Sequence, residues 1–300
     1  MQTLLRLTAA VAIACCVASP ALAAPRVVVS LKPLHSLVAA VMEGVGTPTL
    51  LLAGATSPHV YSLKPSDSRA LLEADIVLWG GPGLETYLQK PIIAVAGRAR
   101  IVTLADEAGL AMLPTREAGE HADAHGGTDG HDMHFWLDPA NAARIVAYSA
   151  QVLVAADPAN AVRYTANRDT ALAALRALND DLAATLASVR GRPFLTLHDA
   201  FQYWEARYQL DGTGTLTVNP DRLPGARSLA AMRQSIVDSG IFCVFGEPQF
   251  PAALGAALVE GTGARLVTVD TIGVDIDPGV QAYAAMMRGL AQAFRACLAP

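Results

Sequence analysis

Positive charge is scarce in this sequence and is nowhere concentrated. Lysine and arginine number 22 against 27 aspartates and glutamates, which leaves a formal net charge of −5 with neutral histidines. No run of basic residues and no basic stripe is present. Because sequence-independent attraction to phosphate needs clustered lysine or arginine, the composition excludes nucleic acid as a partner.

Long hydrophobic runs are also missing, apart from one short run near the start. Residues 7–18 are apolar, which is too short to span a bilayer, and Ser19-Pro20 interrupts them. Ala21-Leu22-Ala23 then supplies a small-residue cleavage signal. Residues 1–23 are therefore predicted to be a secretory signal peptide, cleaved after Ala23. The mature protein is expected to be exported and soluble, with no direct membrane insertion.

Cysteine is rare, and half of it lies in the predicted signal peptide. Of four cysteines, Cys15 and Cys16 leave with that peptide, and Cys243 and Cys297 remain. An even number of cysteines in an exported protein makes one disulfide the default expectation. The alternative is a pair of unpaired buried thiols.

Short apolar runs alternate with helical segments along both halves of the chain. This pattern is typical of an α/β fold with parallel sheets covered on both faces. Strands are expected at 26–30, 49–52, 75–79, 101–104, 194–197, 241–245 and 265–269. Helices are expected at 33–43, from 65, from 139, and at 200–208, 228–238, 251–260 and 280–298.

The stretch from 158 to 189 contains no glycine, and no proline after Pro158. It predicts one helix of roughly 48 Å. We expect it to be a rigid linker at 158–190 between an N-terminal α/β lobe at 24–157 and a C-terminal α/β lobe at 191–300. Within the first lobe, residues 115–133 are rich in glycine, acids and histidine, and read as a flexible loop.

Most of the seven histidines lie where a metal could be bound. Four of them, His121, His125, His131 and His134, fall within 14 residues. The other candidates directly follow predicted strands or lie in the loop after one, and they are His59, His198, Glu247 and Asp270. Ligands of open parallel sheets bind at the carboxyl ends of strands, and imidazole with carboxylate suits Zn²⁺. Taken singly, each of these residues is more often a loop residue or helix cap. For the loop histidines, the alternative is a solvated polar insertion with no metal role.

The motifs around these residues carry a resemblance. They are Val29-Ser30-Leu31-Lys32-Pro33-Leu34-His35, Ser57-Pro58-His59-Val60-Tyr61-Ser62-Leu63-Lys64-Pro65-Ser66-Asp67, His134-Phe135-Trp136-Leu137-Asp138-Pro139, Leu197-His198-Asp199-Ala200-Phe201-Gln202-Tyr203-Trp204 and Cys243-Val244-Phe245-Gly246-Glu247-Pro248-Gln249-Phe250. Together, and in this order, they resemble the metal-binding solute receptors of ABC importers, specifically the zinc-uptake (ZnuA-type) branch of the cluster A-I family.

The resemblance implies a fold, a site and a role. It implies two α/β lobes joined by a rigid helix, with metal in the cleft between them. Carried over, His59, His134 and His198 are ligands, and Asp270 matches a carboxylate ligand position, although Val-Asp-Thr stands where relatives commonly have Asp-Pro. Manganese-binding relatives usually carry glutamate at the position of His198, so histidine there favours zinc.

The same resemblance extends to the rest of the molecule. It implies a periplasmic monomer that is not an enzyme and that passes Zn²⁺ to the membrane permease of an ABC importer. The loop with His121, His125 and His131 resembles the zinc branch's flexible loop and is expected to bind metal weakly. The Cys243 and Cys297 pair matches a disulfide of that branch.

Two alternatives remain open at this stage. The first is a manganese, iron or nickel receptor of the same superfamily. The second is a zinc-dependent hydrolase, in which three histidines leave an open position for water. The motifs H-E-x-x-H, G-x-S-x-G and the P-loop pattern are all absent, which counts against the second. An adhesin-like role is a third reading, without any adhesion module in its favour.

Overall fold

Each half of the chain builds one four-stranded parallel sheet. The computed structural model describes residues 24–95, 98–116, 130–217 and 225–299. The strand order is β2-β1-β3-β4 in the first sheet and β6-β5-β7-β8 in the second, so the two halves repeat one topology. The strands are β1 (Val27–Val29), β2 (Thr49–Leu50), β3 (Ile76–Trp79), β4 (Arg100–Thr103), β5 (Pro193–His198), β6 (Asp211–Thr217), β7 (Cys243–Gly246) and β8 (Arg265–Thr268).

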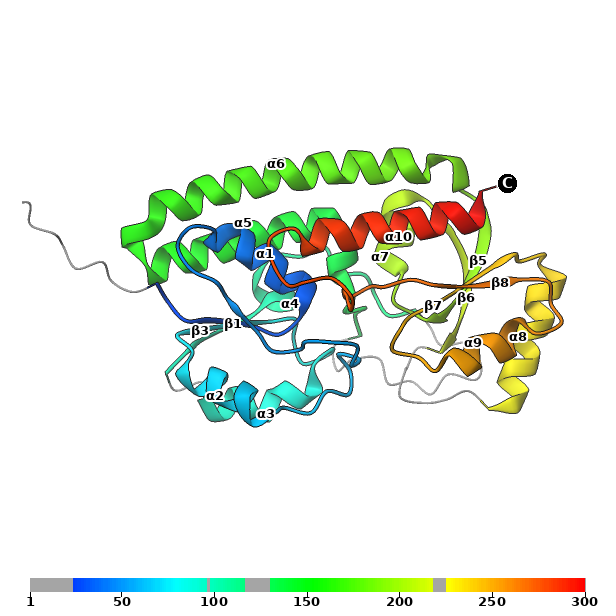
Figure 1. Cartoon of the computed structure of the whole chain (residues 1–300), viewed down its shortest axis with the longest axis horizontal. Helices are drawn as coiled ribbons and strands as arrows, with labels where there is room; N and C mark the ends of the chain where they lie inside the picture. Colours follow the sequence, from blue (N-terminus) through cyan, green and yellow to red (C-terminus); the bar gives the residue numbers. More distant parts are fainter. Residues whose placement is uncertain (1–23, 96–97, 117–129, 218–224, 300) are drawn as a thin grey trace, which may run out of the picture.

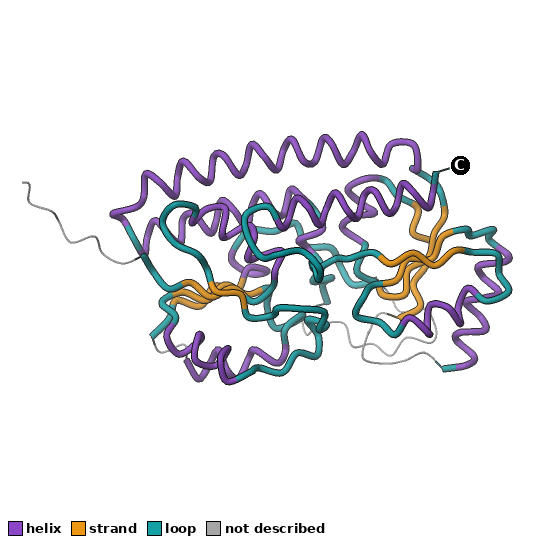
Figure 2. The backbone as a smooth tube through the Cα atoms, viewed as in Figure 1, coloured by secondary structure: helices purple, strands orange, loops and turns teal. Residues whose placement is uncertain are grey.

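The central strands are apolar on both faces because helices cover both. β1, β3 and β7 are buried at every position, as expected for a parallel sheet inside an α/β lobe. Figure 2 shows the two sheets well apart, with helices around each of them. The expected α/β class with two lobes is therefore confirmed.

Ten α-helices complete the described part of the chain. They are α1 (Lys32–Met42), α2 (Pro65–Glu73), α3 (Gln89–Val95), α4 (Leu104–Glu107), α5 (Pro139–Ala156), α6 (Ala161–Leu186), α7 (Gln202–Tyr208), α8 (Ala226–Asp238), α9 (Ala252–Val259) and α10 (Ala282–Leu298). In the first lobe, Leu71 of α2 and Ile92 of α3 pack with Val28 and Val77 of the sheet. α1 and α5 lie on the opposite side of that sheet (Figure 1).

One nearly continuous helix runs past both sheets (Figure 1). α6 is preceded by a 3-10 turn at Pro158–Asn160 and followed by another at Ala187–Val189, so the predicted long helix is confirmed. Its buried side chains Leu175, Leu178, Leu182 and Leu186 recur every three or four residues and form one stripe. α6 packs against α1, α5 and α10.

The last helix connects the C-terminal half back to the N-terminal half. α10 packs against both α1 and α6, although α1 belongs to the first lobe. The domain limits 24–157, 158–190 and 191–300 stay predictions, since the end of the chain shares its core with both halves.

β6 and α3 are among the elements that the sequence did not predict. β6 was not expected, because Asp211, Gly212 and Gly214 weaken its strand pattern. It forms because it is an edge strand, which needs only one neighbour, β5. α3 was also not expected; it is short and contains Pro91 within its seven residues. Its Ile92 packs with residues of α2 and the sheet.

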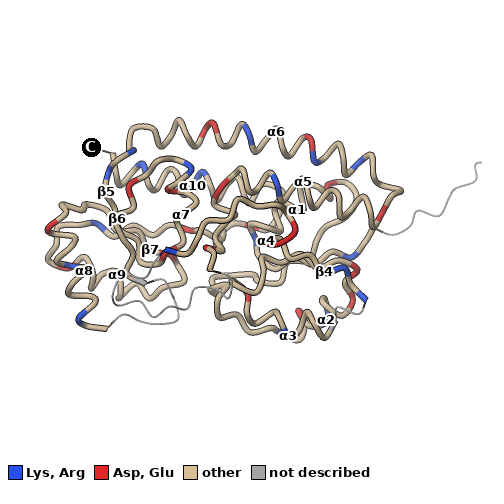
Figure 3. Tube along the Cα trace, turned by 180° about the vertical axis from the view of Figure 1, so that it is seen from behind, with Lys and Arg blue, Asp and Glu red and all other residues tan. Residues whose placement is uncertain are grey.

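Some sequence-based predictions lie outside the described residues. These are the signal peptide at 1–23 and the part of the His-rich loop at 117–129, which includes His121 and His125. Across the ranges that the structure does describe, no helix is both long and apolar enough to cross a membrane. Basic and acidic residues are interspersed along the trace (Figure 3).

A disulfide joins the second sheet to the last helix. Cys243, at the start of β7, and Cys297, near the end of α10, are bonded, with their Cα atoms 6.1 Å apart. Both residues are buried. The predicted pairing is confirmed. The bond ties a central strand to the helix that packs against the first lobe.

Reduction of this disulfide is expected to lower the free energy of unfolding by about 2–4 kcal/mol, because the bond closes a long loop in the unfolded chain. Denaturant unfolding with and without reductant measures the difference. A Cys243→Ala/Cys297→Ala variant is the control and should not respond to reductant. Equal stability of the oxidised and reduced native chain would contradict the prediction.

Candidate metal centre

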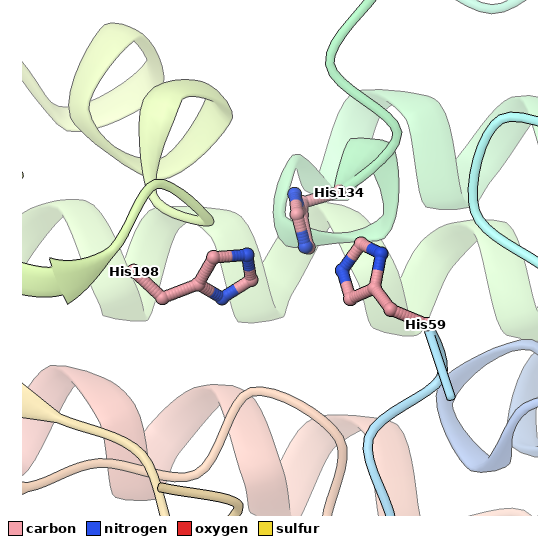
Figure 4. Close-up of side chains that lie close together, drawn as sticks. All are labelled: His59, His134 and His198. Atoms are coloured by element: carbon pink, nitrogen blue, oxygen red, sulfur yellow. The ribbon is translucent and has the colours of Figure 1, made fainter. Parts of the chain in front are cut away.

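Three histidines from distant parts of the sequence meet between the two lobes. His59 lies in the segment after β2, His134 directly precedes the 3-10 turn Phe135–Leu137, and His198 ends β5. The ring centroids are 5.6 Å apart for His59 and His134, 5.4 Å for His59 and His198, and 4.8 Å for His134 and His198. One ring nitrogen of each lies within 4.8 Å of the others. Figure 4 shows the three side chains pointing toward one another.

Local structure fixes the segment that carries His59. The Tyr61 hydroxyl donates to the Asp67 carboxylate at 2.7 Å, and the Lys64 backbone N–H donates to the same group at 2.8 Å. Asp67 lies in the first turn of α2, where a carboxylate also favours the helix dipole. The sequence from Tyr61 to Asp67 therefore anchors the loop that presents His59.

The position of His198 follows from the sheet topology. Its strand, β5, neighbours β7 at the point where the strand order of the second sheet reverses, which is where ligands bind in open α/β sheets. Glu247 directly follows β7, and its Oε2 accepts a hydrogen bond from His198 Nδ1 at 2.8 Å. Since the carboxylate is an acceptor, Nδ1 carries a proton, and in the neutral ring Nε2 then keeps its lone pair.

His134 is oriented in the same way by a different carboxylate. Asp132 Oδ1 accepts from the His134 backbone N–H at 2.9 Å and from His134 Nδ1 at 2.8 Å. Asp132 and His134 are both buried. Sequence reasoning did not single out Asp132, although its place two residues before a candidate ligand is a usable signal. A carboxylate behind a ligating imidazole is a recurrent feature of metal centres.

Two of the imidazole nitrogens in this group have no hydrogen-bond partner. Nε2 of His59 and Nε2 of His198 are buried without a hydrogen bond. A buried polar atom without a partner is costly, and a metal ion would satisfy both atoms at once. The donor set, nitrogen atoms from three neutral imidazoles, fits Zn²⁺ and leaves a further position for an oxygen ligand.

Burial and nearby acids shift the pKa values of His59 and His134 in opposite directions. Burial holds the pKa of His59 well below its ordinary value, and the neighbouring His198 and His134 add to the effect. Burial also disfavours the charged form of His134, but the hydrogen bond and charge of Asp132 outweigh it and raise the pKa of His134. His59 is therefore neutral and ready to bind metal near neutral pH, whereas protons compete more strongly for His134.

A second group of buried acids surrounds one arginine beside the centre. Arg116 pairs with Asp199 at 3.2 Å and with Glu205. Burial raises the pKa values of Asp199 and Glu205, against the opposing charge of Arg116. Gly212 leaves room for Glu205, because a Cβ there would lie 2.3 Å from its Oε1. This cluster connects the base of the 117–129 segment to the C-terminal lobe.

Apolar and polar groups close the pocket around the histidines. The Trp136 ring lies 5.4 Å from that of His134, and the Phe250 ring lies 5.6 Å from that of His198. Gln249 also lines the pocket, and its Oε1 is buried without a hydrogen bond. Sequence reasoning did not find Gln249 as a site residue, because a lone amide carries no spacing signal.

The structure does not bring Asp270 to the three imidazoles. Its Oδ1 accepts from the backbone N–H groups of Ile272 and Gly273 at 3.1 and 2.8 Å, and its Oδ2 accepts from that of Val274. Among the described residues, the group able to hold a metal contains His59, His134 and His198 and not Asp270. Both carboxylate oxygens of Asp270 are engaged in shaping a turn in this structure, and its expected role as the fourth ligand stays a prediction.

The remaining histidines have other surroundings. His131 is exposed and pairs with Pro114 in an isolated bridge, apart from the three-histidine group. His35 is buried, and its Nε2 donates to the carbonyl of Pro48 at 2.9 Å.

Comparisons with known sequences point to one family. The family model described as zinc-uptake complex component A, periplasmic, matches residues 27–297. The high-affinity zinc uptake system protein ZnuA of Brucella abortus (strain 2308) is 39% identical over 304 residues, covering 91% of each chain. Its namesake from Yersinia pestis is 32% identical over 300 residues, covering 92% of each chain.

Solved structures share the fold. A crystal structure of ZnuA has a TM-score of 0.79 at 24% identity and covers 92% of this chain and 100% of that chain. The periplasmic zinc binding protein TroA from Treponema pallidum also has a TM-score of 0.79, at 20% identity, with 92% and 99% of the two chains covered. The arrangement of two lobes and a long helix is common to all three.

Metal affinity is expected to fall as the pH is lowered from about pH 8 to about pH 5, because ligand imidazoles must be neutral. The raised pKa of His134 places the start of this fall above the range of a free histidine. Each displaced proton lowers the apparent Zn²⁺ affinity by about tenfold per pH unit below the relevant pKa. Competition with a chromophoric chelator measures it, and an affinity that stays constant over this range would contradict a three-histidine site.

Proposed function

The chain belongs to the family of periplasmic zinc-uptake complex component A proteins, matched over residues 27–297, and on this premise we propose that it captures Zn²⁺ and delivers it to an ABC importer. The relatives that carry this name are high-affinity zinc uptake system proteins. In this role Zn²⁺ is cargo, and it has to be both bound tightly and released.

The convergence of His59, His134 and His198 carries the proposal. Buried Nε2 atoms of His59 and His198 lack partners, and carboxylates behind His134 and His198 hold those rings by their Nδ1 atoms. We propose the three Nε2 atoms as the Zn²⁺ ligands, with an oxygen from water or from Gln249 in the remaining position. Nitrogen-rich ligation favours zinc over manganese, which prefers oxygen.

The location of the histidines between lobes suits capture and release. His59 and His134 belong to the N-terminal lobe, and His198 belongs to the C-terminal lobe. A relative movement of the lobes would therefore separate the ligands and weaken the site without any chemical step. Delivery to the importer follows from such a movement when the receptor docks on the permease.

Two features favour a receptor over the alternative hydrolase. Glu247 and Asp132 each accept a hydrogen bond from a ligand imidazole, so both nearby carboxylates serve to orient a ring. The pocket is lined by Trp136, Phe250 and Ile272, which leave little room for a peptide or ester beside the metal.

The cellular setting follows the family. We propose that residues 1–23 direct export, that the mature protein works in the periplasm as a monomer, and that its partner is the membrane permease of a zinc ABC importer. The names of the relatives support this setting.

The segment from 117 to 129 is proposed as a weaker, auxiliary zinc-binding element. Its neck is held by hydrogen bonds from Thr115 N–H to Gly130 O and from Asp132 N–H to Leu113 O, both 2.9 Å. A glycine-bearing segment must lose chain entropy to bring His121, His125 and His131 to one ion, so it should bind less tightly than the cleft. Asp132 and His134 follow it directly, which provides a short route to the cleft.

Replacement of His59, His134 or His198 by alanine should each weaken Zn²⁺ binding by about a hundredfold or more, since a structural-type site loses a full ligand. His131→Ala is the matched control and should leave the tight site unchanged, because His131 is exposed and apart from the group. Isothermal titration with a competing chelator gives the affinities, and native mass spectrometry gives the metal and its stoichiometry. Near-native affinity in His198→Ala would refute the assignment.

Deletion of residues 120–129 should remove weak Zn²⁺ binding and leave one tight site. This deletion spares Arg116, which contacts the C-terminal lobe, and Asp132, which contacts His134. Titration of the deletion variant and the native chain, together with transfer of metal to the importer, tests it. Identical stoichiometry, affinity and transfer in both proteins would exclude a metal role for the segment.

A further inference from the structure

Lys32 is a buried lysine whose ammonium group crosses from one lobe to the other. Lys32 follows β1 at the start of α1 and is only 6% exposed. Its Nζ donates to the carbonyls of Val274 and Ile276 at 3.0 and 2.8 Å, and also to that of Gly273. These acceptors belong to the loop between β8 and α10. All three N–H groups of the ammonium are thereby satisfied.

The loop that receives Lys32 is shaped by Asp270. Its carboxylate accepts from three consecutive backbone N–H groups, those of Ile272, Gly273 and Val274. Gly273 has a φ of +73°, a conformation that other residues adopt only under strain. The carboxylate thus engages the N–H groups of the turn, while the carbonyls of the same turn and of Ile276 face Lys32.

The same loop reaches the metal centre through Thr271. The Thr271 hydroxyl donates to Glu247 Oε1, and Glu247 Oε2 accepts from His198 Nδ1 at 2.8 Å. The Thr271 carbonyl accepts from Trp136 Nε1 at 2.8 Å. Thr271 therefore contacts the acid that orients one candidate ligand, and also the tryptophan two residues after another.

We propose that Lys32 and Asp270 form an interlobe latch that holds Thr271 and Glu247 in place and so positions His198. Asp270 sets the shape of the loop, and Lys32 fixes the loop to the N-terminal lobe. Thr271 links the loop to Glu247 through its hydroxyl group. Neither Lys32 nor Asp270 touches the metal. The relevance of the latch to zinc rests on the proposed function.

The latch and a direct ligand role for Asp270 predict different behaviour. If Asp270 acts through the loop, Lys32→Met and Asp270→Ala should weaken the same interaction, and the double variant should be little worse than either single variant. If Asp270 binds metal directly, Asp270→Ala alone should weaken binding, and Lys32→Met should retain native affinity. That second pattern would overturn the proposal.

The first measurement uses the metal-free protein. Long-range proton–nitrogen NMR of the histidine rings reports which nitrogen of His198 carries the proton. The native chain should show a proton on Nδ1, and Lys32→Met, Asp270→Ala and Thr271→Val should each show a mixture of tautomers. Lys90→Met makes the same chemical change at an exposed site and should match the native chain. An unaltered His198 tautomer in all three latch variants would refute the latch.

The second measurement is Zn²⁺ affinity by chelator competition. Each latch variant should bind about 10- to 100-fold more weakly than the native chain, the usual effect of losing support behind a ligand. Native affinity in all three would also refute the latch. Thr271→Val removes a single hydroxyl and keeps the buried lysine, so it tests the link to Glu247 if Lys32→Met unfolds. The NMR arm needs no metal, so a native chain that fails to bind Zn²⁺ refutes the proposed function and leaves the latch test intact.

Discussion

The proposed zinc site requires imidazole nitrogens from two different lobes to meet at one point, each with an unprotonated lone pair. No helix or strand can bring His59, His134 and His198 together locally, because they are separated by many residues and by the interlobe boundary. Everything that fixes one lobe against the other therefore also fixes the metal centre. Contacts across the lobe boundary therefore decide whether the three histidines can meet.

Several of the contacts between the lobes are charged or polar and buried. Arg116 pairs with Asp199 and Glu205 beneath the neck of the His-rich segment, and the Lys32 ammonium lies among carbonyls of the opposite lobe. Such groups stabilise one geometry because a small displacement would leave them buried and unpaired. The helices α6 and α10 add an apolar frame that packs against α1 from the first lobe.

Buried carboxylates make the electrostatics of the centre favourable to positive charge. Asp132 and Glu247 orient two of the rings and supply buried negative charge. Burial keeps His59 neutral, while Asp132 favours the charged form of His134. The buried charge of these acids would offset part of the charge of a metal ion in the proposed site.

Much of this arrangement is encoded locally and could be predicted from the sequence. The apolar runs at β1, β3 and β7 indicate buried parallel strands, and the stretch after Pro158 predicts a long helix because it lacks glycine and proline. The histidines after strands point to the carboxyl edge of the sheets, and the motifs around them identify the family. These features depend on neighbours in the sequence, which is why residue patterns report them.

Other features depend on contacts between distant residues, and only the tertiary structure decided them. β6 forms because an edge position beside β5 accepts a strand weakened by two glycines. Asp270 has the right residue type and the right place after β8 for a ligand, yet its oxygens bind the backbone of their own turn. Whether a carboxylate binds a metal ion or a peptide N–H depends on its position to within a few ångströms. The geometry of the turn sets that position, and the residue pattern does not reveal it.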